Sequence, residues 1–531
     1  MPPSKTSNVP DVDASSSRVS RAPILILGAG INGASLAREL VLNGANVLVV
    51  DRADIGSGTT AYSSRLIHGG LRYLEYGDAA LVRESLEERD RLLRLAPDFV
   101  RPLEFRVPTS SRLGGSIGSI RKLLTGKSPR KPTPRGSWLV RVGLGWYAWL
   151  SRGSSLPQPS TLGGNAVARM RLAPRYRQVC SYYDGQMQHA ERFTAALLDD
   201  ARRVAAERGT AFDVRTYSEI EVRDATLVVR DTLQRREPYE LRPAAVVNAS
   251  GPWGDRTLQQ LDGRESHLLA GTKGTHLLTF QPALRKAIGE AALYVEAEDG
   301  RPVFILPFGV GTLVGTTDLP YDGDPAKAVA SEAELAYLID LVNGVLPDVR
   351  LSRSDVTLHY AGVRPLPRSD AAVPAAVSRR HSLVERTGLP WPVWTIVGGK
   401  LTTCRSLAEE GAALVLGRLG RSASIVSRER PIPLPRDEEG DTDNDAAQVV
   451  GTTWTRGQVR RLIRREYVRR LDDLIERRLM LLFEPQLSRA TLDELASLLL
   501  AERLLDESQR QAAVTQMIER LSRHFGRELD A

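Results

Sequence analysis

A short stretch near the N-terminus limits this chain to a small set of folds. An apolar run, Pro23-Ile-Leu-Ile-Leu27, leads into Gly28-Ala-Gly30-Ile-Asn-Gly33, after which residues 34–43 have a helical pattern. A second apolar run, Asn46-Val-Leu-Val-Val50, ends at Asp51. A strand, a glycine-rich turn, a helix and a second strand in this order form a β-α-β unit. Its two strands are therefore expected to lie parallel in one sheet.

Each glycine of this motif has a mechanical role. Gly28 allows a tight turn after the strand, Gly30 lets a pyrophosphate approach the backbone, and Gly33 lets the helix pack closely on the strand. The helix N-terminus presents free N–H groups to an anion. Asp51 lies where a carboxylate accepts hydrogen bonds from a ribose 2′-OH. The acid favours FAD or NAD over NADP, and it does not separate FAD from NAD.

Changes in composition along the chain indicate three parts. Residues 1–22 are rich in Ser, Pro and Asp and are expected to be a disordered tail. Residues 23–431 alternate strand and helix patterns, and the segment 431–445 has the Pro-rich, acidic composition of a linker. A C-terminal helical domain is expected over residues 445–531, because residues 458–531 contain almost no Gly. Apolar residues recur there at helical spacing: Val459, Ile463, Tyr467, Leu471, Leu474 and Ile475.

Charge, cysteine content and hydropathy exclude several classes of protein. The 531 residues carry 72 Lys and Arg against 64 Asp and Glu, and this net charge of +8 is too mild to indicate a nucleic-acid binder. The two cysteines, Cys180 and Cys404, cannot form a disulfide framework, so we expect reduced thiols in the cytoplasm. No run of about 18 apolar residues predicts a transmembrane helix. No His, Cys or carboxylate cluster has metal-ligand spacing, so we expect no metal.

Several later segments give the chain a specific resemblance. They are Asp54-Ile-Gly-Ser-Gly-Thr-Thr-Ala-Tyr-Ser-Ser-Arg65, Leu66-Ile-His-Gly-Gly-Leu-Arg-Tyr-Leu-Glu75, Lys273-Gly-Thr-His276, Gly315-Thr-Thr-Asp318, Ala361-Gly-Val-Arg-Pro-Leu366 and Gly398-Gly-Lys-Leu-Thr-Thr403. In this order they resemble the FAD-dependent glycerol-3-phosphate dehydrogenases, over about residues 24–430 and more weakly through the C-terminal helices. One departure is Arg65, where relatives commonly have Lys; the charge is kept but the hydrogen-bond geometry is not.

The resemblance implies a fold, a reaction and a location. The fold would be α/β, with a Rossmann-like FAD-binding domain, an interleaved sheet-based substrate domain mainly at about residues 80–165 and 255–360, and a C-terminal helical cap domain. The reaction would be oxidation of sn-glycerol 3-phosphate to dihydroxyacetone phosphate, with hydride transfer to FAD and electrons passed to quinone. A quinone acceptor implies peripheral contact with the inner face of the membrane. A homodimer is a further expectation.

The stretch 115–150 is the first candidate for membrane contact. Its residues 115–135 read as a basic loop, whose Arg and Lys side chains could meet acidic headgroups. Four aromatic residues after it could lie at the interface: Trp138, Trp146, Tyr147 and Trp149. An ordinary basic loop beside a core helix explains the same pattern equally well.

The implied substrate is a phosphate monoester with a secondary alcohol, so its site needs cations and a base. The residues predicted to bind it are Arg72, Tyr73, Arg364 and Lys400. The predicted catalytic base is His276, because a His titrates near neutral pH. Arg364 could instead polarise the developing alkoxide, and the assignment between the two stays open. Lys273, in the same motif as His276, also falls in a candidate site segment.

A larger set of residues is expected around the cofactor. It comprises Gly28, Gly30, Asn32, Gly33, Asp51, Thr59, Thr60, Ser63, Ser64, His68, Gly69, Gly70, Ser250, Gly251, Gly399, Lys400, Leu401 and Thr402. His68 is expected to orient the flavin ring or to pack. Thr402 is expected near that ring, where N–H groups at a helix start could stabilise negative charge on reduced flavin.

Two other functions remain open from the sequence. A related FAD oxidase of the same fold could use O2 or act on an amine or amino acid. The Arg- and Lys-rich motifs favour a phosphate over a carboxylate substrate. A flavin-binding protein without turnover is the second alternative, and the set Arg72, His276, Arg364 and Lys400 argues against it.

Overall fold

The computed structural model describes residues 22–70, 78–109, 137–150, 153–297, 299–368, 380–424, 427–434 and 443–529. Several expectations fall outside these residues. They are the disordered tail up to residue 21, Arg72 and Tyr73, the basic loop 115–135, and the central part of the linker at 435–442.

The β-α-β unit is part of a six-stranded sheet, in which five strands are parallel and β18 is antiparallel. In spatial order the strands are β18 (Ser382–Arg386), β19 (Val393–Val397), β11 (Ala245–Asn248), β1 (Ile24–Leu27), β2 (Val47–Val50) and β7 (Phe212–Arg215). On one face lie α1 (Ile31–Leu42), α7 (Ala190–Arg208) and α11 (Cys404–Arg418). The expected helix at 34–43 thus begins three residues earlier, directly after Gly30.

Different elements cover the two faces of this sheet. Because side chains alternate along a strand, successive residues of β1 contact different elements. Ile24 and Ile26 point into the core formed with α1, α7 and α11. Leu25 and Leu27 point the other way, against α8 (Gly254–Asp262) and a small antiparallel sheet. That small sheet consists of β10 (Tyr239–Leu241), β9 (Thr226–Asp231) and β8 (Ser218–Arg223). The continuous apolar pattern of β1 reflects burial on both sides.

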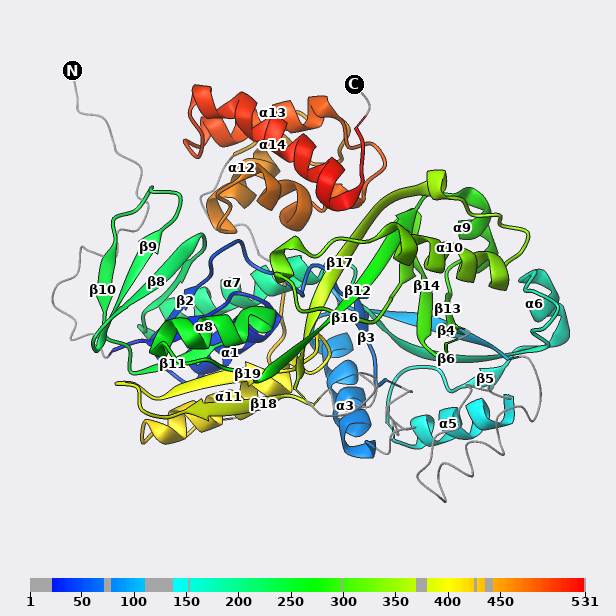
Figure 1. The fold of residues 1–531 in the computed structure, drawn as a ribbon, viewed down its shortest axis with the longest axis horizontal. Helices are drawn as coiled ribbons and strands as arrows, with labels where there is room; N and C mark the ends of the chain where they lie inside the picture. The colour runs from blue at the N-terminus through cyan, green and yellow to red at the C-terminus, as the bar shows by residue number, and fades with distance from the viewer. Residues whose placement is uncertain are drawn as a thin grey trace.

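A second, ten-stranded sheet lies beside the first (Figure 1). Its strands are β16 (Leu319–Pro320), β12 (Leu269–Thr279), β15 (Gly311–Gly315), β14 (Pro302–Phe308), β13 (Ala292–Glu296), β4 (Arg101–Thr109), β6 (Gln178–Gln186) and β3 (Leu66–Ile67), with β17 (Val356–Pro367) beside β12 and β5 (Ser160–Thr161) beside β6. One face packs on α9 (Pro282–Ile288) and α10 (Glu332–Val345). This sheet takes in β6, which lies outside the segments expected for the substrate domain.

Two helices pack near β4 and β6. They are α3 (Ala79–Leu95), which Asp78 caps as its side chain accepts the Leu81 N–H, and α5 (Ser137–Leu150). The short helix α6 (Gly164–Arg169) also lies near β6. The expectation that Tyr147 of α5 lies at an interface is wrong. Its ring is buried and its hydroxyl donates to Asp184 of β6 at 2.7 Å, because Tyr147 is on the inner face of the helix.

The C-terminal helices gather at the top of Figure 1, above both large sheets. They are α12 (Arg456–Arg465), a π-helical turn (Asp473–Arg478), α13 (Arg489–Ala501) and α14 (Glu507–Phe525). The apolar spacing across residues 459–475 predicts continued helix, but α12 ends at Arg465 and Tyr467 has φ +57°. The reason is tertiary: Tyr467 packs against the core of the parallel sheet, whereas Val459 and Ile463 belong to the other core.

None of the helices in the described ranges has the length and hydropathy needed to cross a bilayer.

The close packing of α1 on β1 can be tested at Gly33. A Cβ there would lie 1.9 Å from the Gly28 carbonyl oxygen, so Gly33→Ala must push the helix from the strand. We expect urea denaturation to show a loss of about 1–3 kcal/mol in the free energy of unfolding. Gly417→Ala in α11 is the matched control, because nothing lies within 4 Å of its Cβ. Alanine there should be neutral or add up to about 1 kcal/mol. Equal effects of the two changes would contradict the packing argument.

Candidate active site

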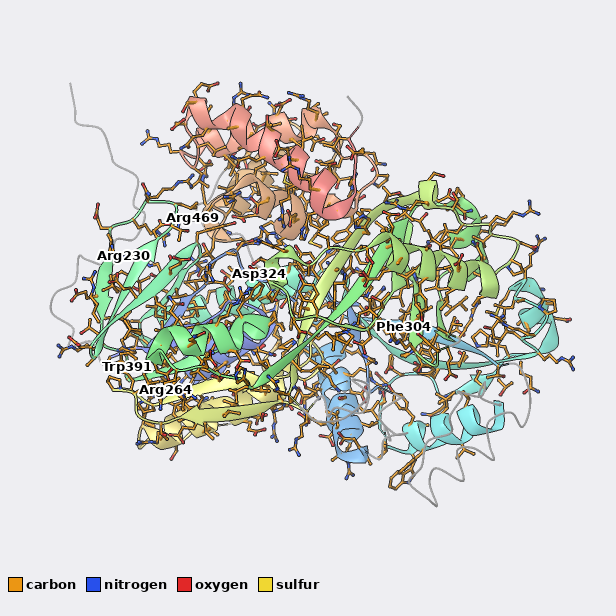
Figure 2. All side chains as sticks on the ribbon, viewed as in Figure 1. Arg230, Arg264, Phe304, Asp324, Trp391 and Arg469 are labelled. Carbon is orange, nitrogen blue, oxygen red and sulfur yellow. The ribbon has the colours of Figure 1, made fainter. Side chains whose placement is uncertain are left out.

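A cleft of about 760 Å³ is lined by residues of both large sheets. Two of its lining residues, Phe304 of β14 and Asp324 after β16, are labelled in Figure 2. The predicted site residues that line it are Gly28, Gly30, Asn32, Asp51, Thr59, Thr60, Ser63, Ser64, His68, Gly70, Ser250, Gly251, His276, Arg364, Gly399, Lys400, Leu401 and Thr402. The fold therefore brings together segments that are more than 300 residues apart in the chain.

The glycine turn forms one end of this cleft. Gly28 has φ +116°, and a Cβ there would lie 2.5 Å from the carbonyl oxygen of Ala249, at the end of the adjacent strand. Gly30 is the N-cap residue of α1 and has no side chain of its own to cap the helix. The positive end of the helix dipole therefore faces the cleft. The hydroxyl of Thr60 accepts the Ile31 N–H at 3.1 Å, so it joins the loop after β2 to the start of α1.

Asp51 lies at the carboxyl end of β2, as expected. Its carboxylate accepts the N–H of Ala29 at 2.6 Å and the N–H of Ala53 at 2.8 Å, so it joins the glycine turn to the loop after β2. Burial raises the pKa of Asp51 to about 6, and the two N–H donors oppose that shift. The group is thus an ionised acceptor at neutral pH.

His276 belongs to a row of residues that crosses the larger sheet. The strand register places Tyr294, Phe304, Gly315, His276 and Tyr360 opposite one another on one face. The imidazole lies over Gly315, where a Cβ would come within 2.2 Å of the ring. It stacks on Tyr360 with ring centroids 4.9 Å apart. Ser64 Oγ lies 2.9 Å from Nε2 of His276, so the loop after β2 also contacts the ring.

Arg364 lies on the same face, four register positions from His276 along the β12–β17 pair. It donates to Asp318 at 3.0 Å and to the Thr316 hydroxyl at 2.8 Å. A Cβ on Gly274 would lie 2.2 Å from Arg364 Nη2, so the missing side chain makes room for the guanidinium. Burial, followed by the charges of Arg364 and Arg65, lowers the pKa of His276 well below the usual value. The site thus combines a neutral imidazole with a permanent cation.

The 398–402 segment before α11 forms another wall of the cleft. Gly399 has φ +92°, and a Cβ there would meet Asn32 Nδ2 at 2.5 Å. The hydroxyl of Thr402 accepts the His68 N–H at 3.1 Å. The His68 ring makes an edge contact with Phe304, with centroids 6.2 Å apart. His68 is therefore held from both its backbone and its ring.

Arg65 has a structural partner that the sequence did not reveal. Its side chain is buried and forms a two-pronged ion pair with Glu191 of α7, at 2.6 and 2.8 Å. It also donates to the Ala61 carbonyl at 2.7 Å and lies 4.8 Å from the Phe483 ring centroid. The planar guanidinium suits this fork geometry, which an ammonium group does not reproduce.

Some predicted residues lie elsewhere. Gly33 lies behind the turn and Gly69 packs against Tyr147 and Leu86, so neither lines the cleft. Lys273 faces the opposite side of β12, where it pairs with Glu334 of α10 at 2.8 Å. The alternation of the strand explains this placement, because Lys273 and His276 are three residues apart and so point to opposite faces.

Several lining residues were not predicted. Trp253, Tyr294, Arg301 and Phe304 all contribute to the cleft. Tyr294 and Phe304 share the face of His276 only through strand register, which no local motif encodes. Trp253 differs from these two residues, because a local sequence marks it: it ends the Asn-Ala-Ser-Gly-Pro-Trp segment that begins at the last residue of β11.

The cleft fits a dinucleotide on three observations. The start of α1 at Gly30 matches a pyrophosphate, and the carboxylate of Asp51 matches a ribose. Among the described residues, nothing hydrogen-bonds to the buried Oδ1 of Asn32, which lines the cleft beside that helix start. A bound ligand with donor groups would satisfy this atom.

The electrostatic pairing of His276 and Arg364 can be measured directly. We expect NMR of labelled histidine to show a His276 imidazole that stays neutral well below pH 6.5, because burial and Arg364 disfavour the charged form. Arg364→Met removes a positive neighbour and should raise this pKa. The His276→Asn protein assigns the signal. A His276 signal that titrates in the ordinary range, unaffected by the Arg364 change, would contradict the arrangement.

Comparison with known protein families identifies a match to FAD dependent oxidoreductases over residues 23–404. The glycerol-3-phosphate dehydrogenase of Synechocystis sp. is 34% identical over 75% of this chain and 71% of its own length. The aerobic glycerol-3-phosphate dehydrogenase of Escherichia coli K12 is 30% identical over 80% of this chain and 79% of its own. The D-erythritol 1-phosphate dehydrogenase of Brucella abortus is 33% identical over 73% and 72%.

A solved structure agrees at the level of the fold. The glycerol-3-phosphate dehydrogenase from Bacillus halodurans, complexed with FAD, has a TM-score of 0.67 at 20% identity and covers 95% of each chain. This confirms the α/β, FAD-binding fold that the motifs predict. The family match also separates FAD from NAD, which the position of Asp51 could not do. The chain belongs to the FAD-dependent oxidoreductases, in the group that includes the glycerol-3-phosphate dehydrogenases, and FAD is its cofactor.

Proposed function

We propose that this protein oxidises sn-glycerol 3-phosphate to dihydroxyacetone phosphate. The observation that carries the proposal is that a buried imidazole, His276, and a fixed cation, Arg364, lie on one wall of the cleft. The relatives named glycerol-3-phosphate dehydrogenase, at 30% and 34% identity, support the same substrate.

Oxidation of the secondary alcohol removes a hydride from carbon 2 and a proton from its hydroxyl. FAD, when bound, supplies the hydride acceptor. His276 takes the proton, and the hydroxyl of Ser64, 2.9 Å from its Nε2, orients the ring.

Arg364 binds and polarises rather than accepting a proton, because a guanidinium stays charged in proteins. Asp318 and Thr316 hold its two terminal nitrogens in place, so the cation is oriented before the substrate arrives. Lys400, in the 398–402 segment that lines the cleft, supplies a second positive charge for the phosphate dianion. Arg72 and Tyr73 remain sequence predictions for the same anion.

An anaerobic experiment distinguishes the proposed role of His276 as the base from that of Arg364 in binding the substrate. Glycerol 3-phosphate should bleach the flavin absorbance of the wild-type protein. We expect His276→Gln to retain FAD but to lower the rate of bleaching by about 10²–10⁴-fold, as loss of a general base does. Arg364→Met should chiefly raise the glycerol 3-phosphate concentration at half-maximal rate. Lys286→Met, which removes an exposed cation outside the cleft, is the control for net charge and should change neither quantity.

The same experiment tests the alternatives. Faster bleaching by an amino acid would support an amine-type oxidase, and faster bleaching by erythritol phosphate would support the four-carbon substrate named for the Brucella relative. A yellow protein that no substrate bleaches would support a binding protein without turnover. Admission of a soluble quinone or O2 to the reduced enzyme then shows the acceptor. We expect the quinone to reoxidise it faster.

A quinone acceptor requires membrane contact, and we propose that α5 provides it on the cytoplasmic side. Val142, Trp146 and Trp149 are 49%, 46% and 51% exposed. Their spacing of four and three residues puts them on one face of the helix, while Leu144 and Tyr147 are buried on the other. Exposed tryptophans on an amphipathic helix suit the headgroup level of a bilayer. The basic sequence just before α5 supports an anionic membrane as the occupant.

Vesicle co-sedimentation tests this surface. We expect the double change Trp146→Ala and Trp149→Ala to weaken binding to phosphatidylglycerol vesicles by roughly tenfold or more, because two indole rings lose their burial. Val310→Ala removes an apolar side chain that is 65% exposed in the turn between β14 and β15, and it should leave binding unchanged. Undiminished sedimentation of the double variant would rule out α5 as the membrane contact.

A further inference from the structure

The segment 51–65 carries much of the cleft but has little regular structure of its own. It contains Asp51, Thr59, Thr60, Ser63 and Ser64, all of which line the cleft. Turns and bends make up most of it, between the end of β2 and the start of β3. A segment of this kind is expected to sample other conformations unless neighbouring elements hold it. The C-terminal helices contact it at Asp54 and at Tyr62.

The first contact is a buried ionic cluster at Asp54. The Asp54 carboxylate is fully buried and accepts two hydrogen bonds from Arg478, at 2.7 and 2.9 Å. It accepts a third from Arg477 Nε at 2.6 Å. Both arginines are buried and come from the π-helical turn at Asp473–Arg478. A carboxylate this deeply buried depends on these partners, since removal of a partner leaves an uncompensated charge.

The second contact is at Tyr62, eight residues further along. Arg520 of α14 donates to the Tyr62 hydroxyl at 3.3 Å. The Tyr62 ring lies 5.7 Å from the His524 ring and 6.4 Å from the Phe525 ring, both at the end of α14. Tyr62 itself lines the cleft, so α14 supports a residue of the cleft wall from behind.

The two contacts are joined within the C-terminal helices. Glu476 accepts from Arg477 at 2.8 Å and from Arg520 at 2.8 Å. The ion pairs therefore run without a break from Asp54 through Arg477 and Glu476 to Arg520, and a hydrogen bond continues from Arg520 to Tyr62. Linked hydrogen bonds of this kind act as a unit, because displacement of one member exposes the charge of the next.

We propose that the C-terminal helices hold the 51–65 segment in its FAD-binding conformation, with Asp54 and Tyr62 as the positioning residues. The proposal rests on FAD as the cofactor and not on the identity of the substrate. A segment that is ordered in advance loses less conformational entropy when FAD binds, so the affinity is higher than for a loose segment. The contacts at Asp54 and Tyr62 thus retain the cofactor although neither side chain belongs to the dinucleotide motif.

Another ion pair joins the same helices to the body of the protein without touching this segment. Arg469, labelled in Figure 2, donates to Asp231 of β9 at 2.7 Å, and both side chains are buried. It is a matched control: like Arg478, Arg469 is a buried arginine of the C-terminal part that pairs with an aspartate of the FAD-binding part.

The experiment measures release of FAD from the diluted holoenzyme by the rise in flavin fluorescence. We expect Arg478→Met to raise the FAD dissociation constant by at least about tenfold with an unchanged far-ultraviolet circular dichroism spectrum. Excess FAD should restore the bound flavin. Arg478→Lys, which keeps the charge, should lie between the variant and the wild type. Arg469→Met should change the constant by less than about twofold. Hydrogen exchange at residues 52–64 should accelerate in Arg478→Met and not in Arg469→Met.

Tyr62→Phe gives a second measurement in case Arg478→Met does not fold. It keeps the ring and removes only the hydroxyl that Arg520 contacts, so it should accelerate exchange at residues 60–64 and raise the dissociation constant to a smaller extent. Unchanged FAD release and exchange in the folded variants would overturn the proposal. Equal weakening by Arg469→Met would also overturn it, because general docking of the helices would then be responsible. Neither readout uses glycerol 3-phosphate, so a wrong substrate assignment leaves this test unaffected.

Discussion

The crowding of three backbone segments at the end of β1 sets the geometry of the whole molecule. The carbonyl oxygen of Gly28 lies against Gly33, and the Cα of Gly28 lies against the carbonyl of Ala249. Side chains at these positions would separate the strand, the helix and the adjacent strand β11. Because they are absent, the start of α1 lies directly over the carboxyl ends of the parallel strands, and the cleft begins there. This is where ligands bind in open parallel sheets, since the helix dipole and free N–H groups point outward.

Glycines have a second and different use in the larger sheet. Gly274 and Gly315 lie on the cleft face of β12 and β15, and their missing side chains leave space for the Arg364 guanidinium and the His276 ring. The two functional groups thus lie flat on the sheet, where neighbouring strands fix their positions. Burial, and after it the charge of Arg364, lowers the pKa of His276, which keeps the ring neutral. A neutral ring is the form that can accept a proton.

Many arginines of this chain have structural rather than catalytic roles. Arg65, Arg89, Arg405 and Arg478 are buried and pair with Glu191, Asp184, Glu88 and Asp54 respectively. Buried pairs add little net stability, because the charges lose their hydration. They do fix which elements meet, since an unpaired partner is costly. In this chain they join α7 and the π-helical turn to the 51–65 segment, α3 to β6, and α11 to α3.

The sequence by itself determined the elements whose signals are local. The order of strand, glycine turn and helix at residues 23–51 predicts the parallel sheet and the dinucleotide end of the cleft, because spacing and steric limits act between neighbours in the chain. Lys273 and His276 show where such reasoning ends, since they share one motif and lie on opposite faces of β12. Only the tertiary structure decided that Tyr294 and Phe304 face His276, that Glu191 pairs with Arg65, and that α12 ends before Tyr467. Strand register and burial set these contacts, and both depend on residues that are far apart in the sequence.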